Sequence, residues 1–172
     1  MLGAPCVVRG QDRLGWEASA GVAIPRGRTA ASRRVGPAAH LALRVGHPAS
    51  NLAFGVLAAV GFMPGETIAT DQSGNSIEQS SLRIGTFAAT AHLESPTGGP
   101  GAFGEIGAGV SWITQTNYPI TTKAPMLLAG AGVRAPVARI PLRLGLQYHL
   151  YVTDLVEGTD NSLRIYIGVG RR

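Results

Sequence analysis

The stretch IPLRLGLQYHLYV, residues 140–152, alternates large apolar side chains with polar or small ones. Its apolar series is Ile140, Leu142, Leu144, Leu146, Tyr148, Leu150 and Val152. Because successive side chains of a β-strand point to opposite faces of the sheet, this period of two predicts a strand. Such a strand is longer than the strands of soluble proteins, which usually have about five or six residues. Its apolar face could cover a protein core or meet lipid, and the rest of the chain must decide.

The same alternation recurs along the chain and predicts eight strands in one domain. Residues 51–65 are uncharged, but they are shorter than the roughly 20 residues of a membrane helix and they alternate, which favours a strand. We find no internal repeat and no linker, so we expect one domain over residues 14–172, after an N-terminal segment, residues 1–13, that could be a signal remnant. The predicted strands lie at about 15–24, 37–46, 51–62, 78–94, 102–114, 124–135, 140–152 and 162–170.

The strand predicted at 78–94 changes phase within its length. Leu82 and Ile84 begin the apolar series, whereas Phe87 and Ala89 continue it on the other parity. One extra residue in a strand resets the alternation, so we predict a β-bulge near Gly85. Leu82 and Ile84 would then lie on the same apolar face as the rest of the series.

Short and long connections alternate along the chain. GHPAS, SPTGGPG and PVAR are short and rich in Gly or Pro, as tight turns are, whereas PRGRTAASRRVG, MPGETIATDQSGNSI, QTNYPITTK and DLVEGTDN are longer. A Greek-key sandwich has no reason to sort its loops in this way. Membrane barrels have short periplasmic turns and longer outer loops. The pattern therefore predicts an all-β protein, an eight-stranded antiparallel up-and-down transmembrane β-barrel.

The composition agrees with extended structure and excludes some chemistry. Glycine accounts for 24 of the 172 residues and charged residues for 15%, which does not fit an ordinary helical protein. The net charge of +5 comes almost entirely from arginine, because Lys123 is the single lysine. Cys6 is the single cysteine, which excludes an intramolecular disulfide and a cysteine zinc site.

From about Leu14 to its end, the chain resembles the small eight-stranded outer-membrane β-barrels of bacteria, with their OmpA-like and OmpX-like members. The resemblance implies a location in the bacterial outer membrane, with lipid around the apolar face. It also implies a narrow interior packed by side chains, since eight strands leave little more room than that. The aromatic residues available for the two lipid interfaces are Trp16, Phe62, Phe87, Trp112 and Tyr148.

The polar face of the strands would place seven charged side chains inside this barrel. An unpaired buried charge is costly, so we predict that they form a salt-bridge network that packs the lumen and blocks passage. The alternative is an anion-preferring pore, favoured by five arginines against two glutamates. The predicted lumen charges are Glu17, Arg44, Arg83, Glu105, Arg134, Arg143 and Arg164.

No motif points to catalysis, a cofactor or a metal. The sequence has neither a G-x-S-x-G elbow nor an H-E-x-x-H pair, and its four histidines lie on different segments, where we expect interior hydrogen bonding. GEIGAG at 104–109 lies within a strand, and no helix follows it as a phosphate loop would require. We therefore predict a non-enzymatic protein with a structural role, or a role in surface interaction through its longer loops.

The expected partners follow from this prediction. The barrel would contact the lipid bilayer, and its outer loops could bind a protein partner, while the pattern says nothing of the oligomeric state. The first long loop carries a basic cluster without aromatic neighbours, which argues against nucleic acid and favours anionic lipid, such as lipopolysaccharide phosphates. The alternative is a soluble or subunit-type β-barrel or sandwich whose apolar face packs on partner proteins. The basic cluster consists of Arg26, Arg28, Arg33 and Arg34.

Overall fold

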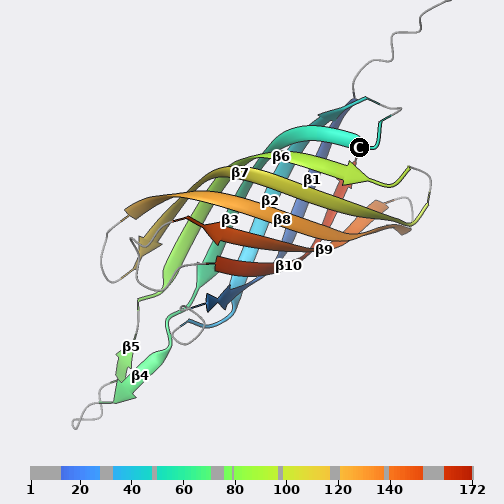
Figure 1. Ribbon diagram of the computed structural model, residues 1–172. Coiled ribbons are helices and arrows are strands. Elements are labelled where there is room, and N and C mark those ends of the chain that lie inside the picture. The colour runs from blue at the N-terminus through green and yellow to red at the C-terminus, as the bar shows by residue number, and fades with distance from the viewer. Residues whose placement is uncertain are drawn as a thin grey trace, which may run out of the picture.

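The computed structural model describes residues 13–27, 33–47, 50–70, 76–78, 80–96, 99–116, 121–137, 140–152 and 161–171. These residues form ten strands (Figure 1). Among them, no helix is both long enough and apolar enough to cross a membrane. The strands are β1 (Arg13–Arg26), β2 (Gly36–Gly46), β3 (Leu52–Met63), β4 (Thr67–Thr70), β5 (Ser76–Glu78), β6 (Leu82–Glu94), β7 (Gly101–Gln115), β8 (Thr121–Val137), β9 (Ile140–Tyr151) and β10 (Asn161–Arg171).

Eight of these strands close into a barrel. The hydrogen-bonded order is β1-β10-β9-β8-β7-β6-β3-β2, and every pair is antiparallel. β1 closes the barrel by pairing with β10, from Trp16 opposite Arg171 to Arg26 opposite Asn161. The predicted eight-stranded antiparallel up-and-down barrel is therefore confirmed.

The short β4 and β5 strands make a separate two-stranded sheet within the connection from β3 to β6. In Figure 1 this hairpin extends away from the barrel at the end opposite the C-terminus. We call this end, which carries the β1–β2, β3–β6, β7–β8 and β9–β10 connections, the long-loop end, and the other the short-turn end. The β7–β8 connection, residues 116–120, is shorter than predicted, because β8 already begins at Thr121. Two backbone contacts hold the base of the hairpin to the β1–β2 connection. The backbone amide of Arg34 donates a hydrogen bond to the carbonyl oxygen of Pro64 at 2.8 Å, and Arg33 forms an isolated antiparallel β-bridge with Gly65.

The strands are staggered as they pass around the barrel. A row of directly paired residues starts at Leu14 on β1 and returns to β1 at Ile24, ten residues further along. Closing a sheet into a barrel requires this kind of stagger, which tilts the strands against the barrel axis. β1 runs from the short-turn end to the long-loop end. A row of paired residues that is followed from β1 to β2 and onward to β8 therefore moves steadily closer to the long-loop end.

The outer surface of the barrel is apolar and the lumen is polar over much of its length. On β9, Leu144 and Leu146 point outward and are exposed, whereas Arg143, Gln147 and His149 alternate with them and are buried. The other strands also turn large apolar side chains outward, among them Phe54 on β3, which is 62% exposed. Soluble domains bury their large apolar side chains, so this surface is inside-out relative to a soluble core.

The β-bulge predicted near Gly85 is wrong. β6 pairs with β3 and with β7 in one continuous register, from Leu82 to the end of the strand. Leu82 and Ile84 point into the lumen and are almost completely buried, and Arg83 between them faces outward. The apolar residues at the start of β6 face other apolar side chains inside the barrel, and not lipid.

The lumen therefore has two layers. Toward the long-loop end it holds an apolar cluster, beside the buried Arg164, His149 and Ser162 of β9 and β10. The cluster includes Met63, Leu82, Ile84, Ile113 and Met126. Toward the short-turn end it is filled by charged and polar side chains, which form the site described next.

Candidate functional site in the barrel lumen

Glu17 on β1 lies at the centre of the buried charge network and is 0% exposed. Its Oε2 accepts a hydrogen bond from Nη1 of Arg44 at 2.8 Å and lies 3.3 Å from Nη1 of Arg143. Its Oε1 lies 3.0 Å from Nε2 of His40. These partners come from β2 and β9, so Glu17 ties three strands together across the lumen.

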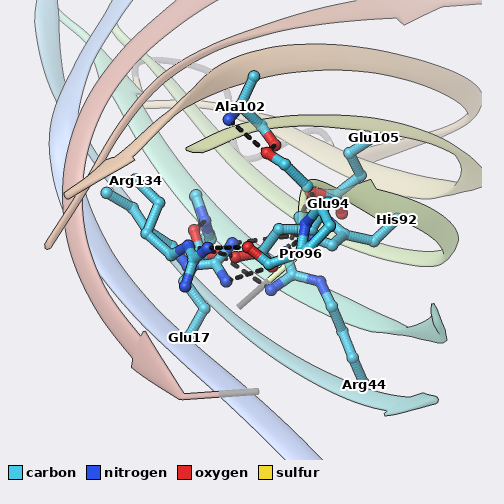
Figure 2. Close-up of polar contacts among 11 residues, drawn as sticks. Glu17, Arg44, His92, Glu94, Pro96, Ala102, Glu105 and Arg134 are labelled. Atoms are coloured by element: carbon cyan, nitrogen blue, oxygen red, sulfur yellow. Dashed lines mark hydrogen bonds and ion pairs between the residues drawn. The ribbon is translucent and has the colours of Figure 1, made fainter. Parts of the chain in front are cut away.

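Two further carboxylates complete the network (Figure 2). Glu105 accepts a hydrogen bond from Nη2 of Arg44 at 3.1 Å. Glu94 accepts one from Nη2 of Arg143 at 2.7 Å and forms an ion pair with Nε of Arg134 at 2.8 Å. Because Arg44 and Arg143 each bridge two carboxylates, three arginines and three glutamates form one connected set with no net charge. Such pairing offsets the cost of burying charge.

His92 connects two of these carboxylates. Its Nε2 lies 3.2 Å from Oε2 of Glu94, and its Nδ1 lies 3.7 Å from Oε2 of Glu105. Its ring also stacks on Phe103 at 5.5 Å between centroids, and the Arg143 guanidinium lies 5.2 Å from the centroid of the same Phe103 ring. Aromatic packing therefore holds the polar groups in place from one side.

The structure brings together most of the predicted lumen charges. Glu17, Arg44, Glu105, Arg134 and Arg143 join the network at the short-turn end, and Arg164 is buried in the lumen but lies outside it. The placement of Arg83 in the lumen is wrong, because its side chain is exposed on the outer wall.

Glu94 belongs to the network and is absent from the predicted set. It is the last residue of β6, beside the turn to β7. In the sequence it is the last residue of the strand predicted at 78–94, directly before the turn SPTGGPG, and it has the inward parity of His92, which was the available signal.

Arg164 on β10 is a buried arginine that forms no ion pair with a carboxylate in the described part of the chain. It is 2% exposed, and its Nε, Nη1 and Nη2 have no hydrogen-bond partner among the described residues. A Cβ added to Gly61 of β3 would lie 3.4 Å from Nη2 of Arg164, so the guanidinium lies against this glycine. The lumen described here thus holds one arginine more than it holds carboxylates.

Ser19, His40 and Glu17 form a hydrogen-bonded chain of the kind used by serine hydrolases. The Oγ of Ser19 lies 2.8 Å from Nδ1 of His40, whose Nε2 lies 3.0 Å from Glu17. Ser19 is only 9% exposed and lies directly opposite Gly168 in the wall, so an acyl substrate has little access to its hydroxyl. Tyr166 packs edge-on against His40 at 4.5 Å. The chain of hydrogen bonds therefore orients buried side chains.

The described residues contain no group of three or more His, Cys, Asp or Glu side chains that could hold a metal ion. The network carboxylates are instead engaged by arginines. The expectation that no cofactor binds stays a prediction.

The arginines of the basic cluster in the first long loop differ in how exposed their side chains are. Arg26 is exposed at the end of β1, and Arg34 is exposed with Nε 3.9 Å from Oε1 of Glu66. Arg33 is largely buried, at 8% exposed, and Arg28 lies outside the described residues. The described part of the cluster thus offers Arg26 and Arg34 to the surface.

Comparison with known proteins gives a fold and no family. No family model and no curated protein matches the chain. Among solved structures, it is similar to Neisserial surface protein A, with a TM-score of 0.66, 12% identity, and coverage of 93% of this chain and 97% of that chain. It is also similar to the outer membrane enzyme PagL, with a TM-score of 0.50, 14% identity, and coverage of 92% of this chain and 99% of that chain. The chain thus has the fold of the small eight-stranded outer-membrane β-barrels.

Proposed function

We propose that this protein is a barrel of the bacterial outer membrane, with a structural or surface-interaction role and no catalysis. The observation that carries the proposal is the inverted arrangement of the barrel, with a continuous apolar outer wall around a buried network of charges. Monomeric soluble proteins rarely expose continuous apolar patches larger than roughly a few hundred Å². A membrane barrel, by contrast, needs an apolar band where its wall contacts lipid.

The long-loop end is the interacting end in this proposal. It carries the β4–β5 hairpin, which extends beyond the barrel wall, and the exposed Arg26 and Arg34. Membrane barrels direct their longer loops to the outside of the cell, so this end would face the exterior. A protein partner would bind the hairpin and its neighbouring loops, and Arg26, Arg28 and Arg34 would contact lipopolysaccharide phosphates.

The lumen supports a structural role over conduction. The charged layer is cross-linked from strand to strand by Arg44 and Arg143, and the other half of the interior is packed by the apolar cluster together with buried side chains of β9 and β10. A structural barrel gains rigidity from such an interior, because breaking one strand away would leave buried charges unpaired.

The first test is migration on a denaturing gel after refolding into detergent, with boiled and unboiled samples side by side. We expect a boiling-dependent shift together with a β-rich circular dichroism spectrum, because a closed, lipid-stabilised barrel resists the denaturant until it is heated. A β-rich protein that stays soluble without detergent and shows no shift would contradict the proposal. It would favour the subunit-type alternative, in which partner proteins cover the apolar wall.

A further inference from the structure

The outer wall carries a groove of about 880 Å³ near the long-loop end, which we call the wall groove. It crosses β1, β2, β3, β6 and β7, and its lining is almost entirely apolar apart from one charged residue, Arg83. The lining includes Ala20, Ala39, Val60, Gly85, Trp112 and Arg83.

Small side chains on one row of paired residues create the hollow. In this row Ala20 pairs with Ala39, Ala39 with Val60, Val60 with Gly85, and Gly85 with Trp112. A Cβ added to Gly85 would have no atom within 4 Å, so the position opens directly into the groove. Bulkier Val60 and Trp112 border it. The groove is thus shaped by the choice of small residues at three positions on neighbouring strands.

Two cations lie at one end of this groove. Arg83 faces outward from β6 and lines the groove, and Lys123 on β8 is exposed and directly opposite Trp112. Neither forms an ion pair with a described side chain. An outward cation is costly within the hydrocarbon of a bilayer, so such residues lie where a polar head group can meet them.

The stagger of the strands gives the groove a direction. The row from Ala20 on β1 to Lys123 on β8 climbs toward the long-loop end, so the small residues of β1 and β2 lie deepest and the cations lie highest. Trp112 lies between them, and because tryptophan is enriched at the boundary between hydrocarbon and head groups, we take Trp112 to mark that boundary on this side of the barrel. An apolar floor that leads up to two cations matches a lipid with an acyl chain below and a phosphate above.

We infer that the wall groove binds the lipid anchor of one lipopolysaccharide molecule, with an acyl chain along Ala20, Ala39 and Gly85 and a phosphate between Arg83 and Lys123. The inference rests on the proposed function, which places the long-loop end in the outer leaflet, where lipopolysaccharide is the phosphorylated lipid. Arginine and lysine both form charge-assisted hydrogen bonds with phosphate oxygens. The site is distinct from the loop arginines and lies on the lipid-facing wall.

The test is native mass spectrometry of the refolded barrel in detergent, titrated with purified bis-phosphorylated lipid A. We expect a one-to-one complex with the unaltered chain. We expect Arg83→Gln combined with Lys123→Gln to weaken it at least tenfold, and Gly85→Leu, which fills the groove without meeting backbone, to weaken it by a similar factor. Lipid A without its phosphates should bind at least tenfold more weakly to the unaltered chain.

Two matched controls separate the site from general effects. Arg171→Gln removes an outward arginine that lies opposite an outward tryptophan, Trp16, at the short-turn end. Ala89→Leu places the same leucine side chain elsewhere on the outer face of β6. Both should bind lipid A as the unaltered chain does. Equal binding of phosphatidylglycerol and lipid A, or unchanged binding by both groove variants, would overturn the inference.

The boiling-dependent gel shift, run on the same samples, keeps the two proposals apart. Variants that keep the shift but lose lipid A support the wall groove. If the unaltered chain shows the shift and binds no lipid A, the wall groove fails and the membrane barrel stands. If the unaltered chain shows no shift, the proposed function itself fails, and with it the inference.

Discussion

The buried arginines of the lumen differ in what surrounds each guanidinium, and that difference predicts opposite effects on stability. Arg143 serves Glu17 and Glu94 together, so Arg143→Met leaves two buried carboxylates short of donors. Removing one partner from a buried ion pair costs about 3–5 kcal/mol. We expect the free energy of unfolding, measured by urea titration in detergent, to fall by an amount of that order.

Arg164→Met should raise the free energy of unfolding. Its guanidinium is buried without an ion-pair or hydrogen-bond partner in the described lumen, and methionine fills similar volume without a charge. Replacing buried ionic groups by apolar ones of similar size stabilises proteins by about 1–4 kcal/mol in known cases. Arg171→Met, at an exposed position, is the control and should change little. A loss of stability in Arg164→Met equal to that of Arg143→Met would show that Arg164 has a counter-charge in solution.

At this scale the sequence predicts most inward positions, because parity along a strand is visible in one chain. It does not predict which charges meet. Arg44 and Glu105 lie 61 residues apart, and their contact depends on how the barrel is staggered. Nor does it distinguish Arg164 from Arg143, since both have inward parity and only the fold shows that the carboxylates gather at the other end.

At the scale of single strands, the contrast between two glycines tests how tightly neighbouring strands pack. A Cβ on Gly21 of β1 would collide with the carbonyl oxygen of Ile165 on β10, across the pair that closes the barrel, whereas a Cβ on Gly85 meets open space. We expect Gly21→Ala to force these strands apart and to lower the unfolding temperature, read from the loss of the gel shift. Gly85→Ala should leave the temperature unchanged or raise it, because alanine restricts the unfolded chain. Similar behaviour of the two variants would contradict the packing described for the β1–β10 pair.

β6 shows why alternation alone is an incomplete guide to a strand. The rule that apolar residues face lipid holds where the interior is polar, and from Phe87 onward β6 follows it. At Leu82 and Ile84 the interior is apolar too, so these residues carry no information about which face they occupy. A regular strand whose interior neighbours change from apolar to polar along its length therefore gives the same sequence pattern as a bulged strand with a uniformly polar interior.

For the whole molecule, a lumen filled by two layers predicts a barrel that does not conduct. We expect the refolded protein to give no stable channels in planar lipid bilayers at moderate salt, because eight strands leave an interior that side chains fill. A porin refolded in the same way is the positive control. Regular, anion-selective current steps would contradict the expectation and would favour the anion-preferring pore instead.

The architecture as a whole was predictable because the number of strands and the sorting of connection lengths both depend on local sequence. Closure was predictable as well. A closed sheet has no unpaired strand edges, which are disfavoured, and a sheet with one apolar and one polar face can curl into a cylinder that hides the polar face. The position of the wall groove was not, because Ala20, Ala39 and Gly85 are far apart in sequence and become neighbours only through the pairing of four strands.

The uneven division of the lumen bears on how such a barrel enters a bilayer. A chain that arrives from the periplasm must send its long-loop end across the hydrocarbon first. The strand segments that follow this end carry mainly the apolar layer, with Arg164 as the exception, while Glu17, Arg44, Glu94, Glu105 and Arg143 trail near the point of entry. Most of the ionic side chains of the lumen can therefore stay hydrated until their partners on other strands arrive. Of the described lumen charges, Arg164 is the one that crosses the oily interior of the membrane ahead of them.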